Sequence, residues 1–506
     1  MKTFIFFQII LLKLSLSIYN SGENWAVLAC GSSGYINYRH QADIFHVYHT
    51  LINRGFLKEH IILFAFDDIA YDKKNPFPGE VYNRPNGPNV YEGVIIDYRN
   101  NMVTPDNYLS VLKGDTKNGR LKKVLNSTKE DNIFLYFSDH GINGAMVFPD
   151  NKFLYADELQ ETFEFMQQKN MYKNIIFYME SCYSGSMFTD LNLDLNIYTL
   201  TAASPQEQSL ATFCYPDDYV KGREMHTCLS NEFTMNWLDD IDEKFEFKKC
   251  KEFYSSREQF RVLKNLTKNS HVQEYGNFEV GELPITLFQS SDDCPIYDDK
   301  YEKKEKEKEK IGDKDNDDII KKIIELDTDD TFDDNEEEEI DSFFEDLYKN
   351  MNNNIENMHK KENDIHINYP KLRNSKKNKN KFRKKSMNKI PSKKVKLYYL
   401  EIEKNESKEK NAEYMKEIEE IDKSKNIFEM IKAKLDITDK EISYNKKIDY
   451  KCLRNSIQLF KDECSLNERD LEFISTLSDI CSIKDIKLDD ISNAIIEVCK
   501  NKNQQI

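Results

Sequence analysis

The sequence predicts an α/β protein with a mostly parallel sheet flanked by helices, followed by a disordered charged linker and a small all-helical region. Strand-like apolar runs alternate with helical periodicity up to about residue 290, blocks of like charge follow, and helical signals return alone after residue 397. The 506 residues suffice for more than one domain. A charged content of 32% and a mean hydropathy of -0.71 are too polar for one compact body.

The amino-terminal residues 1–19 have the order of a cleaved secretory signal. Lys2 precedes the apolar stretch Phe4–Leu12, and small polar residues follow. The stretch is too short to span a bilayer, and no later segment has the ~18 consecutive apolar residues that a span requires. We therefore expect a soluble protein of the secretory route without stable membrane insertion. Three acceptor patterns for N-glycosylation begin at Asn126, Asn265 and Asn405.

Residues 20–290 are expected to form the α/β domain. Apolar runs that fit buried parallel strands lie at 25–29, 61–66, 133–137, 175–179 and 197–200. Helical periodicity falls between or after them at 43–53, 107–112, 156–168 and 231–241.

Residues 291–396 are predicted to be a disordered linker. Between Asp313 and Asp346, 17 of 34 residues are acidic; between Lys371 and Lys396, 13 of 26 are basic and none is acidic. Like charges repel and leave too little apolar surface to form a core. The segment is either a solvated spacer or a cleavable or partner-binding one.

Residues 397–506 are expected to form the small helical region. Ile402–Ile431 is charged and amphipathic, and apolar residues at helical spacing follow between Cys452 and Cys499. The four cysteines 452, 464, 481 and 499 suit two disulfides, with three connectivities open.

Composition argues against two classes of function. A formal net charge of -17 disfavours general nucleic-acid binding, because phosphate contacts require a basic surface. None of the ten cysteines lies in a Cys-x-x-Cys pair, and the helically spaced His46 and His49 lack an obvious third ligand. We therefore predict no metal and no cofactor.

Reactive residues follow two of the predicted strands. The strand 133–137 runs into Asp139, His140 and Gly141, and the strand 175–179 runs into Glu180 and Cys182. If the strands are neighbours in a parallel sheet, His140 and Cys182 emerge at the same edge. An imidazole there could convert the thiol to the attacking thiolate and protonate the leaving amine. The alternative is a buried structural cysteine and an ordinary loop histidine.

Several motifs in order together resemble the legumain family of asparaginyl endopeptidases, which are caspase-like cysteine proteases. The resemblance covers about residues 24–290. It is carried by Gly31-Ser32-Ser33-Gly34, Asn37-Tyr38-Arg39-His40-Gln41-Ala42-Asp43, Asp67-Asp68-Ile69-Ala70-Tyr71, Asn83-Arg84-Pro85-Asn86-Gly87, Asp139-His140-Gly141 and Glu180-Ser181-Cys182-Tyr183-Ser184-Gly185-Ser186.

The resemblance implies a role for each residue of the catalytic edge. Cys182 matches the nucleophile and His140 the catalytic histidine, with Gly141 and the Cys182 amide at the oxyanion site. Asn37 matches the residue that orients the histidine. Asp139 matches a neighbouring aspartate that can form a succinimide.

The resemblance also implies a pocket for the residue before the scissile bond, lined by Arg39, Glu180 and Ser209. An asparagine amide offers one acceptor and one donor group, so an arginine and a glutamate can bind both ends of it. Without the resemblance, Arg39 and Glu180 would be read as a salt bridge. Asn231 departs from the family, which usually has an aspartate there, and this puts strict asparagine preference in question.

For the carboxyl end, the resemblance implies a helical prodomain with the pairings Cys452–Cys481 and Cys464–Cys499. It implies a zymogen that this prodomain inhibits, protein and peptide substrates cut after Asn, or after Asp at low pH, and residence in a lysosome, vacuole or acidic vesicle or secretion. The linker is rich in Asn and Asp, so self-removal of the prodomain is expected.

Two other readings stay open. One is the catalytic subunit of a glycosylphosphatidylinositol transamidase, a relative with the same His and Cys, which would be expected to carry a carboxyl-terminal membrane anchor. The stretch Lys500–Gln505 is polar instead. The other is a non-catalytic binding protein on the same scaffold.

Overall fold

The computed structural model describes residues 22–246, 254–290, 388–438 and 447–503. The predicted signal peptide, residues 1–19, lies outside the described residues. So do residues 291–387 of the predicted linker.

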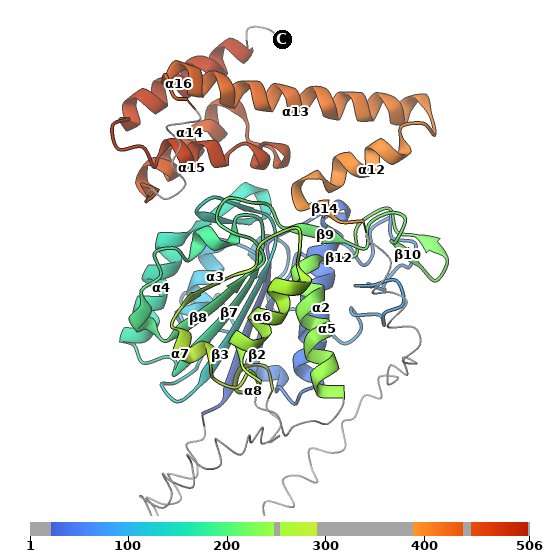
Figure 1. Ribbon diagram of the computed structural model, residues 1–506, viewed down its shortest axis with the longest axis vertical. Coiled ribbons are helices and arrows are strands. Elements are labelled where there is room, and N and C mark those ends of the chain that lie inside the picture. The colour runs from blue at the N-terminus through green and yellow to red at the C-terminus, as the bar shows by residue number, and fades with distance from the viewer. Residues whose placement is uncertain (1–21, 247–253, 291–387, 439–446, 504–506) are drawn as a thin grey trace, which may run out of the picture. The chain divides into compact units, whose positions relative to one another are not determined.

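A six-stranded sheet forms the centre of the α/β region, in the order β13-β8-β7-β3-β1-β2 (Figure 1). Its first five strands in the chain pair in parallel, which confirms the predicted sheet. The edge strand β13 is antiparallel and was not predicted, because its sequence Gln-Glu-Tyr-Gly lacks an apolar alternation. The strands are β1 (Asn24–Cys30), β2 (Ile61–Phe64), β3 (Asn132–Ser138), β7 (Asn174–Glu180), β8 (Ile197–Thr201) and β13 (Gln273–Gly276).

Helices cover both faces of this sheet (Figure 1). Alternate residues of β1 explain why: Ala26 and Leu28 join one hydrophobic cluster and Val27 and Ala29 join the other, as the period of two along a strand requires. The first cluster packs against α2 (Tyr38–Ile52), α5 (Glu232–Glu246) and α6 (Ser256–Leu266). The second packs against α3 (Pro105–Leu112) and α4 (Ala156–Gln168).

Two small antiparallel sheets lie beyond the central one. The first comprises β4 (Gly141–Ile142), β5 (Ala145–Phe148) and β6 (Lys152–Tyr155). The second has the order β12-β9-β14, with β12 at Ser230–Asn231, β9 at Leu210–Thr212 and β14 at Ile390–Pro391.

The end of the predicted linker has defined structure. Residues 388–396 include β14, the short helix η7 (Ser392–Lys394) and the start of α12 (Val395–Glu403). The charge pattern predicted disorder here, but the backbone of β14 pairs with β9. Such pairing depends on a distant strand, so no local pattern reveals it.

The carboxyl-terminal region is all helical, as predicted. Its core contains the stacked rings of Phe428 and Phe460, 4.8 Å apart. Disulfides join Cys452 to Cys481 and Cys464 to Cys499. The helices are α12, α13 (Lys408–Lys434), α14 (Tyr450–Cys464), η8 (Glu468–Glu472), α15 (Ser475–Ile480) and α16 (Leu488–Asn503).

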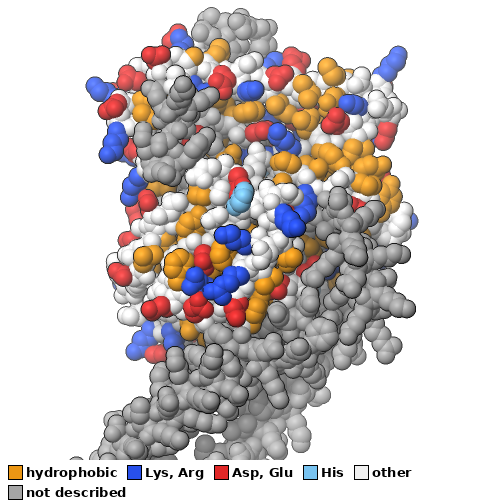
Figure 2. Space-filling model, in the orientation of Figure 1, with side chains coloured by type: hydrophobic (Ala, Val, Ile, Leu, Met, Phe, Trp, Pro, Cys, Tyr) orange, Lys and Arg blue, Asp and Glu red, His pale blue; other side chains and the backbone are white. Residues whose placement is uncertain are grey.

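The described residues contain no helix that is both long and apolar enough to cross a membrane. Figure 2 shows lysine and arginine side chains interspersed with acidic and hydrophobic ones over the face in view.

Candidate active site

The two strands that carry the predicted reactive residues are neighbours. β3 and β7 pair in parallel with Ser138 opposite Glu180, so the residues after both strands emerge at one edge of the sheet. The two turns approach so closely that residue 141 has to be a glycine. A methyl group on Gly141 would lie 2.3 Å from the carbonyl oxygen of Cys182, which no side chain could tolerate.

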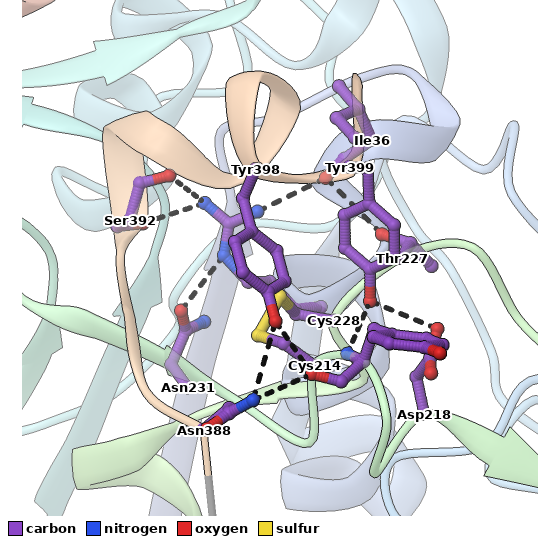
Figure 3. The surroundings of a disulfide bond; sticks show 12 residues. Ile36, Cys214, Asp218, Thr227, Cys228, Asn231, Asn388, Ser392, Tyr398 and Tyr399 are labelled. Atoms are coloured by element: carbon purple, nitrogen blue, oxygen red, sulfur yellow. Dashed lines mark hydrogen bonds between the residues drawn. A yellow bond between two sulfur atoms is a disulfide. The ribbon is translucent and has the colours of Figure 1, made fainter. Parts of the chain in front are cut away.

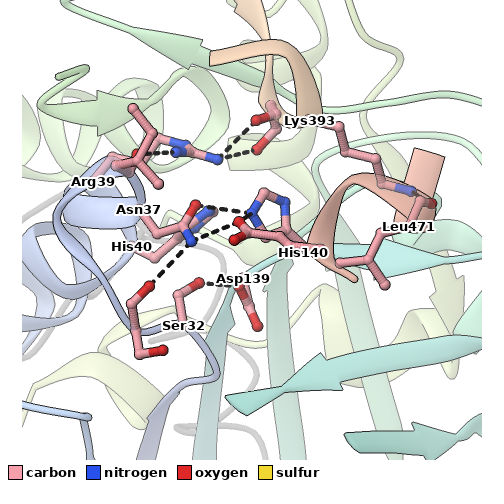
Figure 4. A network of polar contacts seen from close by, with 12 residues as sticks. Ser32, Asn37, Arg39, His40, Asp139, His140, Lys393 and Leu471 are labelled. Atoms are coloured by element: carbon pink, nitrogen blue, oxygen red, sulfur yellow. Dashed lines mark hydrogen bonds and ion pairs between the residues drawn. The ribbon is translucent and has the colours of Figure 1, made fainter. Parts of the chain in front are cut away.

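Asn37 holds the ring of His140. The Oδ1 atom of Asn37 lies 2.9 Å from Nε2 of His140, and Asn37 Nδ2 donates to the Ser33 carbonyl oxygen, which fixes the amide orientation (Figure 4). Since Oδ1 can only accept, the neutral His140 ring carries its proton on Nε2. Its Nδ1 then has a lone pair, and this atom is buried without a hydrogen-bond partner.

Cys182 is 1% exposed and is one of two unpaired cysteines among the described residues, with Cys30. Its Sγ lies 4.0 Å from the hydroxyl of Ser209. Burial raises the pKa of Cys182, while Lys393, Ser209 and Arg39 oppose that rise. The positive groups nearby therefore favour the thiolate that burial disfavours.

The predicted pocket residues Arg39 and Glu180 are both fully buried. No ion pair joins these two described side chains. Arg39 instead donates from Nη1 to the Ile36 carbonyl oxygen and from Nη2 to Ser392. Glu180 accepts two hydrogen bonds from Thr234 at Oε2, and its Oε1 has no partner. Burial raises the pKa of Glu180 to about 8.

Asn231 lies behind Arg39. Its Oδ1 accepts from Arg39 Nε at 3.1 Å, and its Nδ2 donates to Asp43 Oδ2 at 2.7 Å and approaches His40 Nδ1 at 3.2 Å. The Asn231 amide thus links a buried carboxylate to the guanidinium. Burial raises the pKa of Asp43 to about 7, although hydrogen bonds from Ser230, Asn83 and Asn231 act to lower it.

Asp139 is 2% exposed and accepts a hydrogen bond from the Ser32 hydroxyl (Figure 4). Burial raises its pKa. Three side chains each offer one atom of a type that can ligate a metal ion, and these atoms lie within 4.8 Å of one another: His40, Asp139 and His140. The sequence analysis did not single out this group. His46 does not belong to this group; its Nδ1 lies 2.8 Å from Oδ1 of Asn83.

Residues Asn388–Lys394, called the cleft segment below, run through this site. Ser392 accepts hydrogen bonds from Arg39 Nη2 at its carbonyl oxygen (3.0 Å) and at Oγ (2.7 Å), and its amide donates to the Ser209 carbonyl oxygen at 3.0 Å (Figure 3). The next residue, Lys393, lies over the ring of Tyr183 with Nζ 4.8 Å from the centroid. Tyr183 directly follows Cys182.

A carboxylate from the helical region contacts the His140–Asn37 pair. Oε1 of Glu468, at the start of η8, lies 3.3 Å from His140 Nε2 and accepts from Asn37 Nδ2 at 2.8 Å. Burial raises the pKa of Glu468, but the contacts with His140 and Asn37 outweigh it and leave that pKa at about 2. Burial lowers the pKa of His140, and Glu468 partly offsets this.

Sequence reasoning missed the cleft segment, Glu468 and the disulfide between Cys214 and Cys228. The cleft segment lies inside a basic run, and Glu468 has only the signal of a helix start, so neither carried a pattern that points to an active site. The cysteine pair, 14 residues apart, could have been proposed as a disulfide, because the sequence predicts a chain of the oxidising secretory route.

Comparison with known proteins gives a consistent result. The model of the Peptidase C13 family matches residues 24–291, more than half of the chain. Hemoglobinase of Schistosoma japonicum is 43% identical over 270 residues, which are 53% of this chain and 60% of that protein. Human legumain is 41% identical over 273 residues, with the same coverage, and legumain of Canavalia ensiformis is 38% identical over 285 residues, 54% of this chain and 59% of that protein. The matches thus span about three fifths of these relatives.

Proposed function

Because the chain belongs to the peptidase C13 family, we propose that it is a cysteine endopeptidase that cleaves after asparagine and is made as a zymogen. The observation that carries the proposal is the placement of His140 and Cys182 after two adjacent parallel strands, with Asn37 holding the histidine. A cysteine buried for packing alone would need no oriented histidine beside it.

The proposed reaction begins with proton transfer from the Cys182 thiol to Nδ1 of His140, the ring atom with a lone pair. The thiolate attacks the substrate carbonyl carbon, and backbone amides at Gly141 and Cys182 stabilise the oxyanion. His140 returns the proton to the leaving amine as the C–N bond breaks. Water then attacks the thioester, with His140 as general base, and releases the acid and the thiol.

The pocket chemistry supports asparagine as the residue before the scissile bond. Arg39 Nη2 donates to Ser392, and once that residue leaves it can donate to the side-chain carbonyl of a substrate. Glu180 has an unpartnered Oε1 that can accept from the substrate amide nitrogen. An aspartate substrate is a like charge beside Glu180 when both are ionised, whereas below the pKa of Glu180 one proton can join the two carboxyl groups, so cleavage after aspartate is favoured at low pH.

The carboxyl-terminal region is proposed as an inhibitor of this site. The cleft segment occupies the position of a substrate at Arg39, and Glu468 contacts both His140 and Asn37. The bond after Ser392 has two reasons to resist cleavage. A serine side chain is too short to reach both pocket groups, and the Ser392 carbonyl oxygen is held by Arg39 rather than by the oxyanion site.

A secretory route, ending in an acidic vesicle or outside the cell, is proposed for this chain. The three glycosylation patterns support it, because Asn126, Asn265 and Asn405 are all exposed. The disulfides of the described residues support it as well, since disulfides persist in oxidising compartments.

The proposal is tested with the full chain, acidified and assayed on matched peptides that carry Asn, Gln or Ala before the scissile bond. We expect cleavage after Asn, and a Cys182→Ala variant should lose about 10⁴-fold or more in kcat/KM. Cys30→Ala, which removes the other unpaired described cysteine, is the matched control and should retain activity. Undiminished cleavage by Cys182→Ala would overturn the assignment.

A further inference from the structure

The cleft segment binds as an added strand with a defined register. In β14, Ile390 is opposite Ala211 and Pro391 is opposite Leu210, and the amide of Ser392 continues the pairing to Ser209. Pairing of an extended segment to a sheet edge is a common mode of peptide recognition, in which backbone bonds set the register and side-chain pockets set specificity. The positions of this segment therefore mark where substrate residues lie.

Two contacts fix which residue of the segment stands before the scissile bond. Ser392 reaches the pocket arginine Arg39, and Lys393 lies over Tyr183, directly past the nucleophile. If Ser392 stands for the substrate residue in the pocket, Lys389 stands for the residue three positions before it. Figure 3 shows the segment running from Asn388 to Ser392 beside Asn231.

Lys389 meets a buried carboxylate. Its Nζ forms a hydrogen bond and ion pair with Oε1 of Glu232, whose side chain is only 4% exposed. The other oxygen, Oε2, is buried without a hydrogen-bond partner. Glu232 directly follows β12, which pairs with β9 on the side opposite β14, so the sheet holds this carboxylate in place whether or not the cleft segment is bound.

We propose that Glu232 forms a subsite for a lysine or arginine side chain three residues before the cleaved asparagine. The inference rests on the proposed function and extends it to a second specificity pocket. When the cleft segment leaves, Glu232 loses its cation, and a carboxylate this buried is stabilised by a replacement. A basic substrate residue supplies the same charge along the same strand register, whereas an acidic one meets a like charge.

The test uses three peptides that are identical except at this upstream position, which carries lysine, norleucine or glutamate. Each is assayed with the acid-activated wild-type chain. We expect kcat/KM to fall in that order, with lysine favoured over norleucine about tenfold. Norleucine matches the lysine stem without its charge, so the ratio isolates the ion pair. Equal rates for lysine and norleucine would overturn the subsite.

A Glu232→Gln variant should bring the lysine-to-norleucine ratio to about one. Because both peptides are measured with the same sample, the ratio does not depend on how much of the variant folds. Glu224→Gln is the matched control, since Glu224 contacts His226 and Tyr219 instead, and it should keep the lysine preference. A preference that survives in Glu232→Gln would overturn the assignment. Failure of the wild type to cleave any of the peptides would count against the proposed function instead.

Discussion

The cleft segment and the helix η8 reach the same catalytic edge by different physical means. The cleft segment is bound through backbone pairing to β9 and through Arg39, and Lys389 adds an ion pair with the buried carboxylate of Glu232. Glu468 of η8 is bound by charge, to a histidine and an amide, and 54% of its side chain is exposed. Under the proposed function, one contact therefore occupies the substrate's position, whereas the other acts on the groups that move protons and responds to pH.

Ser392→Asn is the substitution with the largest expected effect on this comparison. An asparagine side chain would reach Arg39 and Glu180 and free the main-chain carbonyl for attack, so the bond between 392 and 393 should be cut in the variant. We expect at least about a 100-fold gain in cleavage there, measured by mass spectrometry of the acidified chain.

Ser392→Gln, one methylene longer, is the matched control and should be cut far less. The double variant Ser392→Asn with Cys182→Ala should remain intact. If Ser392→Asn also remains intact while added peptides are cleaved, the segment does not lie in the substrate's register.

Glu468→Gln should have a smaller effect on the same edge. The substitution keeps the size of the side chain but removes its charge, and solvent screens an ion pair that is half exposed, so docking should weaken by about 1 kcal/mol. Peptidase activity of the uncleaved chain at neutral pH should therefore rise about fivefold. Glu463→Gln, a half-buried residue near the end of α14, serves as the control, because no contact among the described residues joins it to His140.

The pH dependence of the Glu468 contact follows from its pKa, which is about 2 in the docked state. An unperturbed glutamate titrates near ~4.3. Because docking depresses this pKa, the contribution of Glu468 is present above about pH 4.5 and is lost as the pH falls toward 2. Activity of the wild type should rise over this window, and the rise should be shallower in Glu468→Gln. Identical profiles would show that η8 does not sense pH through Glu468.

Asn231→Asp should have the smallest effect, because Asn231 acts through Arg39. An aspartate would stand 2.7 Å from Asp43 and share a proton with it, which adds negative charge behind the guanidinium. The Asn-to-Asp ratio of kcat/KM for matched peptides should rise about threefold. The measurement is this ratio across pH in both proteins. An unchanged ratio would mean that charge behind Arg39 does not reach the bound substrate.

Local patterns in the sequence were enough to predict the central sheet and the edge that carries the reactive groups. The apolar runs before His140 and Cys182 fit buried strands, and parallel strands bring their carboxyl ends to one edge. The helical carboxyl-terminal region followed equally well from its periodicity. These features can be predicted from the sequence because each depends on residues that are close together in the chain.

The way in which the carboxyl-terminal region meets the edge with His140 and Cys182 could not be predicted from local sequence patterns. Glu468 contacts a residue 431 positions earlier in the chain, and Lys389 pairs with Glu232 across 157 positions. A basic run predicts disorder when its charges are counted alone, yet backbone pairing to β9 and one buried carboxylate order its last residues. The contacts that stabilise these last residues are made with partners distant in the chain. The local sequence pattern of the linker therefore could not predict their structure.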